Sequence, residues 1–243
     1  YMYVHMCIQT DKLLSIHALC HIMIIPAILV GDLWMFICSF IWWQWIAASA
    51  ISSGYHRYFS HRSFETGPWY EWYVQIIGLF ANPGAVLTWA STHRMHHAYT
   101  DTERDPHSPT LKGFFKVYTS QWGNDVTIER KMIKGLSSTS TKFFHNHYFK
   151  LITVLMVVLL LISPYLFLFG FCMPVVLAFH GYGLVNLVPH TISGQPKNSW
   201  LANILTGGEG WHKNHHEDSR NWRIGKRWYQ FDPGAWFIRI IKR

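Results

Sequence analysis

Three groups of histidines carry the chemistry that this sequence could perform. The first is His56 and His61, with four residues between them, and the other two groups share the spacing H-x-x-H-H. On a helix with 3.6 residues per turn, positions i, i+3 and i+4 lie on one face, so each H-x-x-H-H group directs three imidazoles toward one small volume. The eight residues are His56, His61, His93, His96, His97, His212, His215 and His216.

A ninth histidine, His190, follows Asn186 by four residues, and the two face the same way on a helix. Pro189 is expected to kink that turn. Neutral imidazole is the commonest metal ligand, and a cluster of imidazoles without a metal would bring like charges together on protonation. Nine imidazoles are too many for one ion, so the sequence predicts two ions with four or five ligands each.

The first pair needs a different local geometry from the other groups. His56 and His61 are five residues apart, which on a straight α-helix separates them by well over a right angle. We therefore predict that His56 lies at the end of a helix and that His61 lies in the turn that follows.

Seven further histidines are predicted to have structural roles. His17 and His21, one helical turn apart, and His180 fall in apolar segments, where we expect hydrogen bonds inside a helix bundle. The others are expected in loops or at interfaces: His5, His107, His145 and His147.

The elements that position these groups are predicted to be membrane-spanning helices. Half of the 243 residues are hydrophobic and 14% are charged, below the roughly 25% of a soluble domain. Four apolar segments approach the ~20 residues that a helix needs to cross a bilayer, with short joints at Gly31-Asp32 and near Gly170. They form two predicted helical hairpins, residues 13–30 with 33–53 and residues 151–169 with 171–190.

The positive charges predict the orientation of these spans. All 21 Lys and Arg residues lie outside the four segments. By the positive-inside rule, both termini and the long segments 54–150 and 191–243 are cytoplasmic. We therefore predict one all-α integral membrane domain over residues 1–243, in which a cytoplasmic helical cap carries the two-metal site. The choice between plasma membrane and endoplasmic reticulum stays open.

The apolar segment 72–89 is interrupted by Asn82-Pro83-Gly84, which breaks a helix. A single span there would divide the positive charges between two sides, so we predict a re-entrant or interfacial pair of helices at the cytoplasmic face. The net charge of +8 suits anionic lipid headgroups, a phosphate-bearing substrate or an acidic protein. No motif for nucleic acid accompanies it.

Other classes of site are excluded or left aside by the sequence. The four cysteines form no C-x-x-C pair, and we expect them to pack as small hydrophobic residues. The sequence contains no Gly-rich phosphate loop and no serine nucleophile motif. The chain begins with Tyr1 rather than Met, so we expect further residues to precede it.

Residue types alone leave iron, zinc, copper and nickel open. Carboxylate-bridged di-iron bundles use two Glu-x-x-His motifs and two further glutamates, whereas this chain has only Glu209-Gly-Trp-His212 and no carboxylate in the predicted spans. We therefore predict that Glu209 orients an imidazole. A centre built from neutral nitrogen ligands keeps a high positive charge, which would suit binding and reducing O2 if the metal is redox-active.

The histidine groups resemble the histidine boxes of the membrane fatty acid desaturases. The series H-x(4)-H, H-x-x-H-H, N-x(3)-H and H-x-x-H-H is most similar to that of the delta-9 acyl desaturases, including the stearoyl-CoA type. The similarity runs from about His56 to the C-terminus. It includes Trp89 before the second box, Asp105-Pro106-His107 and Gly113-Phe114-Phe115 after it, and Gly208-Glu209-Gly210-Trp211 before the third.

The resemblance implies two iron ions, with Asn186 reaching one of them through a water. It implies an O2-dependent enzyme that removes two hydrogens in turn from neighbouring carbons and inserts a cis double bond, at delta-9, into a saturated acyl chain. Two electrons would come from a separate donor, a b-type cytochrome or a ferredoxin with a reductase, because the sequence carries no such domain. The implied iron ligands are His56, His61, His93, His96, His97, His190, His212, His215 and His216.

The resemblance also implies an enclosed, bent apolar tunnel for the acyl chain, and Trp89 is the residue we expect in its wall. Acyl-CoA enzymes of animals carry an Arg-Asp pair before the second box that helps to hold CoA, where this chain has Ser91 and Thr92. Polar residues at the bend of the tunnel are replaced by Pro83 and Tyr182.

These departures leave the acyl carrier open between CoA, our first expectation, and a membrane lipid. Lys112 is a candidate phosphate contact, and Asp105, like Glu209, is a candidate partner of a metal ligand. A histidine-box hydroxylase would add an oxygen rather than remove two hydrogens. A metal or haem transporter is the remaining alternative, although transport sites usually lie near the middle of the membrane.

Overall fold

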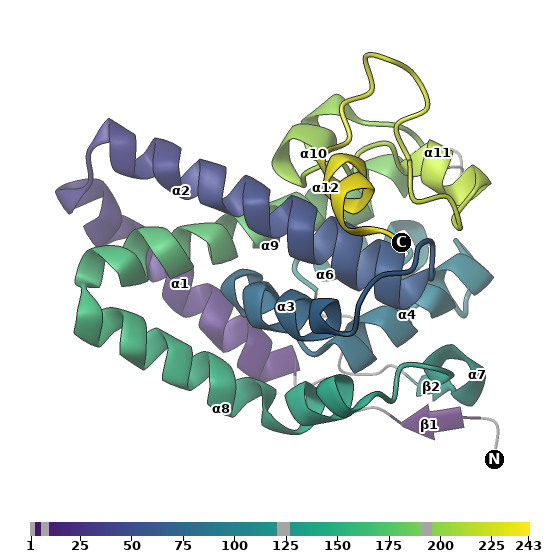
Figure 1. The fold of residues 1–243 in the computed structure, drawn as a ribbon, viewed down its shortest axis with the longest axis horizontal. Coiled ribbons are helices and arrows are strands. Elements are labelled where there is room, and N and C mark those ends of the chain that lie inside the picture. The colour runs from purple at the N-terminus through teal and green to yellow at the C-terminus, as the bar shows by residue number, and fades with distance from the viewer. Residues whose placement is uncertain (1–2, 6–9, 121–126, 191–195) are drawn as a thin grey trace.

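The computed structural model describes residues 3–5, 10–120, 127–190 and 196–243. The described chain is mostly helical (Figure 1), with one antiparallel pairing of Tyr3–His5 with Thr127–Glu129 that the all-α prediction did not include. The elements are β1 (Tyr3–His5), α1 (Thr10–Val30), α2 (Leu33–Ile46), the π-helix η1 (Ala47–Ser60), α3 (Trp69–Gly78), the 3-10 helix η2 (Leu79–Ala81), α4 (Val86–Tyr99), α5 (Pro109–Lys112), α6 (Phe114–Tyr118), β2 (Thr127–Glu129), α7 (Arg130–Ile133), α8 (Thr139–Ile162), the π-helix η4 (Leu166–Cys172), α9 (Met173–Leu187), the 3-10 helix η5 (Val188–His190), α10 (Trp200–Leu205), α11 (His212–Glu217) and α12 (Pro233–Ile241).

Four helical stretches of the described chain are long and apolar enough to cross a membrane: Thr10–Val30, Leu33–Ser60, Thr139–Ile162 and Leu166–His190. The first two lie where the sequence predicted spans, although the second continues through η1 to Ser60. The third begins twelve residues before its predicted start, so His145 and His147, expected in loops or at interfaces, are helical.

The joint between the third and fourth stretches was predicted near Gly170, and this was wrong. Helix α8 ends at Ile162, and the chain turns at Ser163, whose backbone is extended. Pro164 explains the position of the turn, because a residue before proline is disfavoured in the α conformation. Gly170 lies inside η4 instead.

The joint between α1 and α2 is fixed by two residues. The carboxylate of Asp32 accepts the backbone N–H of Met35 at 2.9 Å and caps the start of α2. A Cβ atom on Gly31 would clash with the ring of Phe169 and would lie 2.7 Å from the carbonyl oxygen of Ala27, so a larger residue would force the turn or this ring to shift. The contact ties the tip of the first pair of helices to the second pair.

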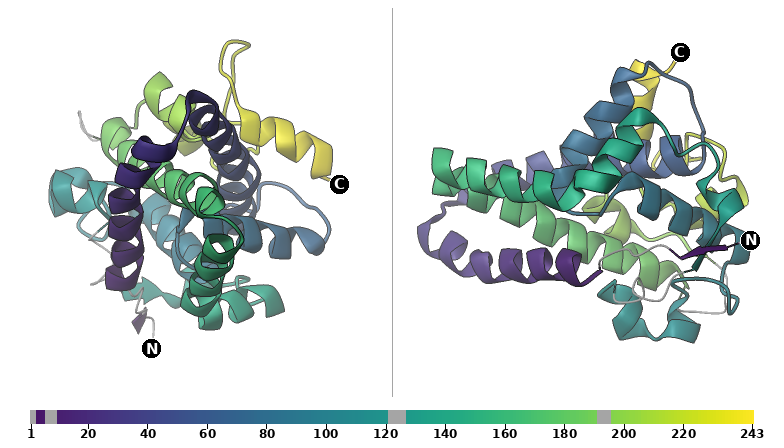
Figure 2. Two further views of the ribbon diagram at one scale, coloured as in Figure 1. Left: turned by 90° about the vertical axis from the view of Figure 1, so that its left-hand side faces the viewer. Right: turned by 90° about the horizontal axis from the view of Figure 1, so that it is seen from below.

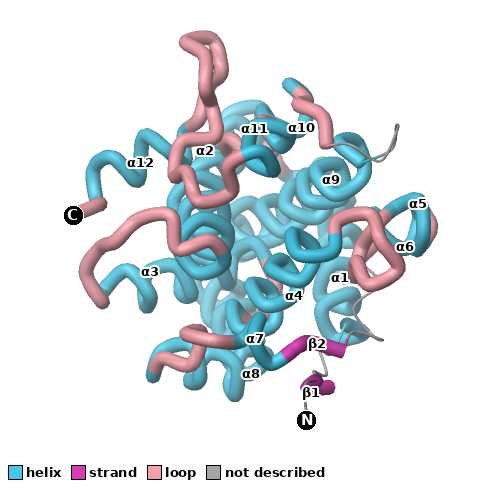
Figure 3. Tube along the Cα trace, turned by 90° about the vertical axis from the view of Figure 1, so that its right-hand side faces the viewer, coloured by secondary structure: helices cyan, strands magenta, loops and turns pink. Residues whose placement is uncertain are grey.

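The long helices lie side by side along the longest axis of the molecule (Figure 1). The segments that carry the histidine groups gather at one end, where α4 and α11 lie beside the continuations of α2 and α9 (Figure 3). Seen along the bundle, α12 projects sideways from it (Figure 2). The short helices therefore surround one end of the four long stretches.

The predicted interruption of segment 72–89 is confirmed. Helix α3 and η2 end before Asn82, which has φ = 50°, and Gly84 follows with φ = 88°. The Tyr55 hydroxyl donates to the carbonyl oxygen of Gly84 at 3.0 Å, and the Tyr148 hydroxyl accepts its N–H at 3.1 Å. The break is thus held between the second and third long stretches, and α4 starts from a fixed point.

The cysteines follow the sequence prediction only in part. Cys20 and Cys172 are buried and pack in one apolar cluster. Cys38 is exposed on α2, so it does not pack in the protein interior. Cys7 lies outside the described residues.

Candidate metal centre

A π-helical segment positions the first histidine pair. In η1 (Ala47–Ser60) the hydroxyls of Ser53 and Ser60 each bond to the carbonyl oxygen five residues earlier, at 2.6 and 2.8 Å. Backbone hydrogen bonds of a π-helix also join residues five apart, so positions i and i+5 lie on the same face of the helix. The ring centroids of His56 and His61 are therefore 4.9 Å apart. His61 does lie in the following turn, but the π-helix rather than the turn alone aligns the pair.

Nine histidines converge in two adjacent groups, and within each group the candidate ligand atoms lie within 4.8 Å of one another. They come from η1 and its end, α4, η5 and α11. The five-histidine group is His56, His61, His93, His97 and His215, and the four-histidine group is His96, His190, His212 and His216.

Each H-x-x-H-H segment divides its rings between the two groups. From α4, His93 and His97 enter the five-histidine group while His96 enters the other. From α11 the pattern is reversed, because His215 joins the five-histidine group and its two neighbours in the segment join the four-histidine group. The prediction that each segment directs all three rings into one volume was therefore too simple, and both helices bridge the two groups.

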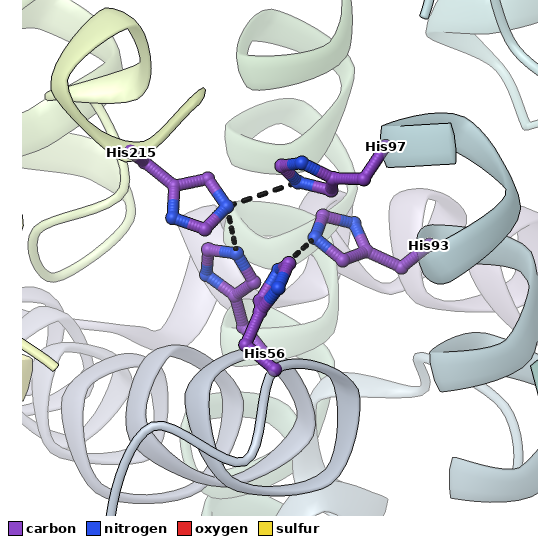
Figure 4. A group of neighbouring side chains, drawn as sticks. His56, His93, His97 and His215 are labelled. Atoms are coloured by element: carbon purple, nitrogen blue, oxygen red, sulfur yellow. Dashed lines mark hydrogen bonds between the residues drawn. The ribbon is translucent and has the colours of Figure 1, made fainter. Parts of the chain in front are cut away.

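The nitrogen atoms have the spacing of a metal coordination shell. The Nε2 atom of His215 lies 2.9 Å from Nε2 of both His56 and His97, and the rings point toward one another (Figure 4). In the other group, Nε2 of His212 lies 3.0 Å from Nε2 of both His190 and His216. Two nitrogens bound about 2.1 Å from one ion at a right angle would lie about 3.0 Å apart.

Carboxylates contact the outer nitrogen of three of these rings. Nδ1 of His96 lies 2.9 Å from Asp105, and Nδ1 of His190 lies 3.2 Å from Asp101. Nδ1 of His56 contacts Glu209, so the residue predicted to orient an imidazole reaches the first box rather than His212 of its own motif.

This arrangement fits a metal ion. A carboxylate that accepts the proton of Nδ1 leaves a lone pair on Nε2, which then faces the centre of its group. Nε2 of His96 is buried and has no hydrogen-bond partner among the described residues. Lone pairs that face one another without a proton between them repel, and a cation between them removes that repulsion.

The protonation states support the same conclusion. Burial lowers the pKa of the His93, His96, His212 and His215 imidazoles well below the usual 6.5. Burial, followed by the neighbouring His190, lowers the pKa of His216 to about 3. These rings are therefore neutral at pH 7 and can donate lone pairs.

A comparison with known families agrees with the site. Residues 32–239, which include all nine histidines, match the family described as fatty acid desaturase. The chain belongs to this family. With four stretches long and apolar enough to cross a bilayer, it is a membrane protein.

The relatives of this desaturase-family chain are named for different acyl carriers and different positions of the double bond. It is 34% identical over 227 residues to a probable chloroplastic lipid desaturase of Arabidopsis thaliana. The aligned region covers 86% of this chain and 62% of the relative. It is 33% identical over 203 residues to an acyl-CoA C20 delta-5-desaturase of Anemone leveillei, covering 77% and 64%. It is 31% identical over 238 residues to an sn-1 stearoyl-lipid 9-desaturase of Anabaena variabilis, covering 88% and 86%. The chain thus spans less than two thirds of the length of the first two.

The sequence analysis did not assign two residues that lie close to the four-histidine group. Asp101 contacts His190, as described above, and His107 stacks on His96 with ring centroids 4.2 Å apart. His107 was expected in a loop or at an interface, and it lies in a turn but is buried. The available signal was the pair of carboxylates, Asp101 and Asp105, that follows the second box.

A buried ionic network was also missed. The Arg57 guanidinium donates to Asp232 at 2.8 Å and to the carbonyl oxygen of Trp222 at 2.8 Å, and it lies 3.4 Å from Glu209. Burial opposes ionisation of Glu209, but His56 and Arg57 outweigh it and hold the pKa of this carboxyl at about 2. The network connects the first box to the C-terminal part of the chain.

A cavity of about 120 Å³ is lined in part by residues that the sequence analysis singled out. They are Pro83, Trp89, Tyr182 and Asn186. The Trp89 ring also stacks on His93, with centroids 5.1 Å apart and planes 16° from parallel. The cavity therefore borders the five-histidine group. Lys112, the candidate phosphate contact, is exposed at the end of α5.

The predicted hydrogen bonds of the span histidines are confirmed for the rings of His21 and His180. Nδ1 of His21 donates to the carbonyl oxygen of His17 at 2.6 Å, and its Nε2 lies 3.2 Å from Nε2 of His180. The Tyr118 hydroxyl lies 2.7 Å from Nδ1 of His180, so this chain of contacts also ties α6 to the bundle.

Acidification is expected to destabilise the metal-free protein. Because burial depresses the pKa of the clustered histidines in the folded state, unfolded chains bind more protons once the pH falls below about 6.5. The free energy of unfolding should be fully retained above that pH and fall as the pH is lowered from 6.5 to 5. Thermal unfolding of chelator-treated protein in detergent, followed by tryptophan fluorescence, measures it. A midpoint that does not change between pH 7.5 and 5 would contradict the neutral, buried state of these rings.

Proposed function

We propose that this chain is an O2-dependent acyl desaturase that inserts a cis double bond at the delta-9 position of a saturated acyl chain. The nine histidines would hold two iron ions, with Asn186 reaching the four-histidine group through a water. When bound, the ions would supply the oxidising power that, with O2 and two electrons from a separate donor, removes two hydrogens from neighbouring carbons. The observation that carries the proposal is the pair of histidine groups beside a cavity.

The residues of the chain would orient the metal-binding imidazoles and shape the cavity for the acyl chain. Glu209, Asp101 and Asp105 hold imidazoles in the orientation that presents Nε2 to the centre of each group. The Trp89 ring separates the cavity from His93, so an acyl chain in the cavity would lie against the wall of the metal centre.

The cavity has polar atoms that a bound molecule or water would satisfy. The hydroxyls of Thr10 and Tyr182 and Nδ1 of His17 are buried there without a hydrogen-bond partner among the described residues. Buried polar atoms are rarely left unpaired, so these three atoms support occupation of the cavity by a ligand or ordered water.

The histidine end of the bundle would face the cytoplasm, as the distribution of Lys and Arg predicts. The same end would receive electrons from the b-type cytochrome or ferredoxin. The membrane could be the plasma membrane or the endoplasmic reticulum, and the topology can be measured with tags that are accessible from one side only.

The acyl carrier in this proposal is CoA, with a glycerolipid as the second candidate. The second candidate is favoured by Ser91 and Thr92, which are buried and bond to carbonyl oxygens of their own helix at 2.7 and 2.8 Å. It is also favoured by relatives named as lipid desaturases. Lys112 would be the phosphate contact if CoA is the carrier.

Expression of the chain in a host without its own desaturase tests the proposal. We expect a new delta-9 monounsaturated fatty acid in the total lipid, identified by mass spectrometry of its derivatives. Labelled stearoyl-CoA and labelled stearoyl glycerolipid, supplied separately to the membranes with an electron donor, identify the carrier. A hydroxylated product, heavier by one oxygen, would contradict the proposal and support a hydroxylase. Unchanged lipids with full iron content would instead support the transporter.

A further inference from the structure

A second ligand-sized depression lies in the C-terminal part of the chain, and none of its lining residues belongs to either histidine group. We call it the C-terminal groove. It has a volume of about 660 Å³ and lies between α12 and the segment of residues 222–231. Its cations are Arg223, Arg227, Arg239 and Lys242, and its aromatic residues include Trp228 and Trp236.

The positive charge of the groove is not balanced within the described chain. Its one carboxylate, Asp232, is only 4% exposed and is engaged by Arg57 and by the backbone N–H groups of residues 224, 225 and 235. None of the ion pairs of the described residues involves Arg223, Arg227 or Arg239. An anion that enters the groove therefore meets no competing carboxylate.

The rim of the groove is unusually apolar for a surface in water. Trp228 is 96% exposed and Trp236 is 57% exposed, while Ile240 beside them on α12 is 82% exposed. Phe231 packs on Trp236 with ring centroids 4.7 Å apart, so the segment and α12 form one continuous surface. Tryptophan that is exposed in this way is typical of the boundary between membrane and water.

The attachment of α10 and α12 places this surface beside the second span. Trp43 and Gln44 of the second span donate to carbonyl oxygens at the end of α10 at 2.7 and 2.8 Å, and Trp45 packs on Phe237 of α12 at 5.6 Å. Helix α12 runs sideways from the bundle, as a helix that lies in the membrane surface would (Figure 2).

We propose that the C-terminal groove binds the phosphate headgroup of an anionic glycerophospholipid of the surrounding membrane. Arg223, Arg227 and Arg239 would contact the phosphate, and Trp228 and Trp236 would contact the glycerol and the first methylene groups. Free phosphate or CoA would use the cations but not the exposed apolar rim. An acidic protein would use the charge but would not account for the exposed apolar surface beside the second span.

Lipid binding to the full-length protein tests this assignment independently of enzyme activity. The protein is purified in detergent, supplied with phosphatidylglycerol or phosphatidylcholine, and bound lipid is counted by native mass spectrometry. We expect the variant R223Q/R227Q/R239Q to retain at least tenfold less phosphatidylglycerol than the wild type. The matched control R130Q/K134Q/R220Q removes the same charge from exposed positions outside the groove and should retain the wild-type amount.

Two further measurements separate the possible occupants. Brominated phosphatidylglycerol in nanodiscs should quench tryptophan fluorescence less in Trp228→Phe than in the wild type, because Trp228 would lie among the lipids. Equal loss of lipid in both triple variants would overturn the proposal in favour of nonspecific charge attraction. Displacement of the lipid by millimolar inorganic phosphate would overturn it in favour of a soluble anion. Binding of an acidic electron-donor protein that the groove variant alone abolishes, with lipid retention unchanged, would also overturn it.

Discussion

Replacement of His215 with Ala is expected to abolish the proposed desaturation and to lower bound iron from the proposed two ions per chain to one or none. Nε2 of His215 is the shared neighbour of Nε2 of His56 and of His97, at 2.9 Å from each, so its loss opens the middle of the five-histidine group. Loss of a group that merely orients a ligand typically costs about 10–100-fold in metal affinity or activity, and loss of a ligand should cost more than 100-fold. His96→Ala should have the same effect on the four-histidine group.

Iron content per chain, measured on detergent-purified protein, and the fatty acid profile of the expression host check this expectation. The amount of protein in the membrane fraction should stay at the wild-type level, because neither histidine faces lipid. His147→Ala is the matched control, since this exposed ring contacts Phe143 of its own helix and belongs to neither histidine group among the described residues. Wild-type iron content together with continued monoene production in the His215→Ala strain would rule out the proposed centre.

Much of the fold could be predicted from hydropathy and from helix-breaking residues. Apolar runs of sufficient length gave the first two spans, and Asn82 with φ = 50° ends a helix where the sequence predicts it. The joint of the second pair was missed because Ser163 and Pro164 lie in an apolar context, and Gly170 looked like the stronger signal. Hydropathy identifies the segments that lipid can surround, whereas a proline determines the residue at which the helix ends.

The histidines of the site could be predicted, but their division between two groups could not. Spacing within one helix shows that His93, His96 and His97 share a face, and this argument says nothing about the helix opposite. His96 is drawn into the other group by Asp105 and by the position of His190 on a distant element. The π-helix that aligns His56 with His61 also has no reliable sequence signal, because it depends on packing of the surrounding helices.

The ionic network around Arg57 is the clearest example of information that local sequence does not contain. Its partners Glu209 and Asp232 are 152 and 175 residues away along the chain. In the sequence, Arg57 is indistinguishable from the other cations that follow a predicted span. In the structure the side chain is fully buried between Asp232, which caps α12, and Glu209, which contacts His56. One guanidinium therefore links the C-terminal helix to the orientation of a candidate metal ligand.

Replacement of Arg57 with Met is expected to destabilise the protein by about 3 kcal/mol, at the lower end of the range for breaking a buried ion pair. Two carboxylates would lose their cation, but Asp232 would keep its three backbone N–H donors, which limits the cost. For a chain of this size the thermal midpoint in detergent should fall by roughly 6–12 °C. Iron affinity should also fall, by about 10–100-fold, because Glu209 would no longer be held against His56.

Companion variants separate the charge from the packing of this side chain. Arg57→Lys should be intermediate, since an ammonium group cannot reach both carboxylates and the carbonyl oxygen of Trp222 as the planar guanidinium does. The double variant R57M/D232N should regain part of the midpoint because it removes one of the unpaired charges, whereas Arg130→Met at an exposed position should leave the midpoint unchanged. If R57M and R130M unfold at the same temperature and bind equal iron, Arg57 neither stabilises the C-terminal segment nor positions Glu209.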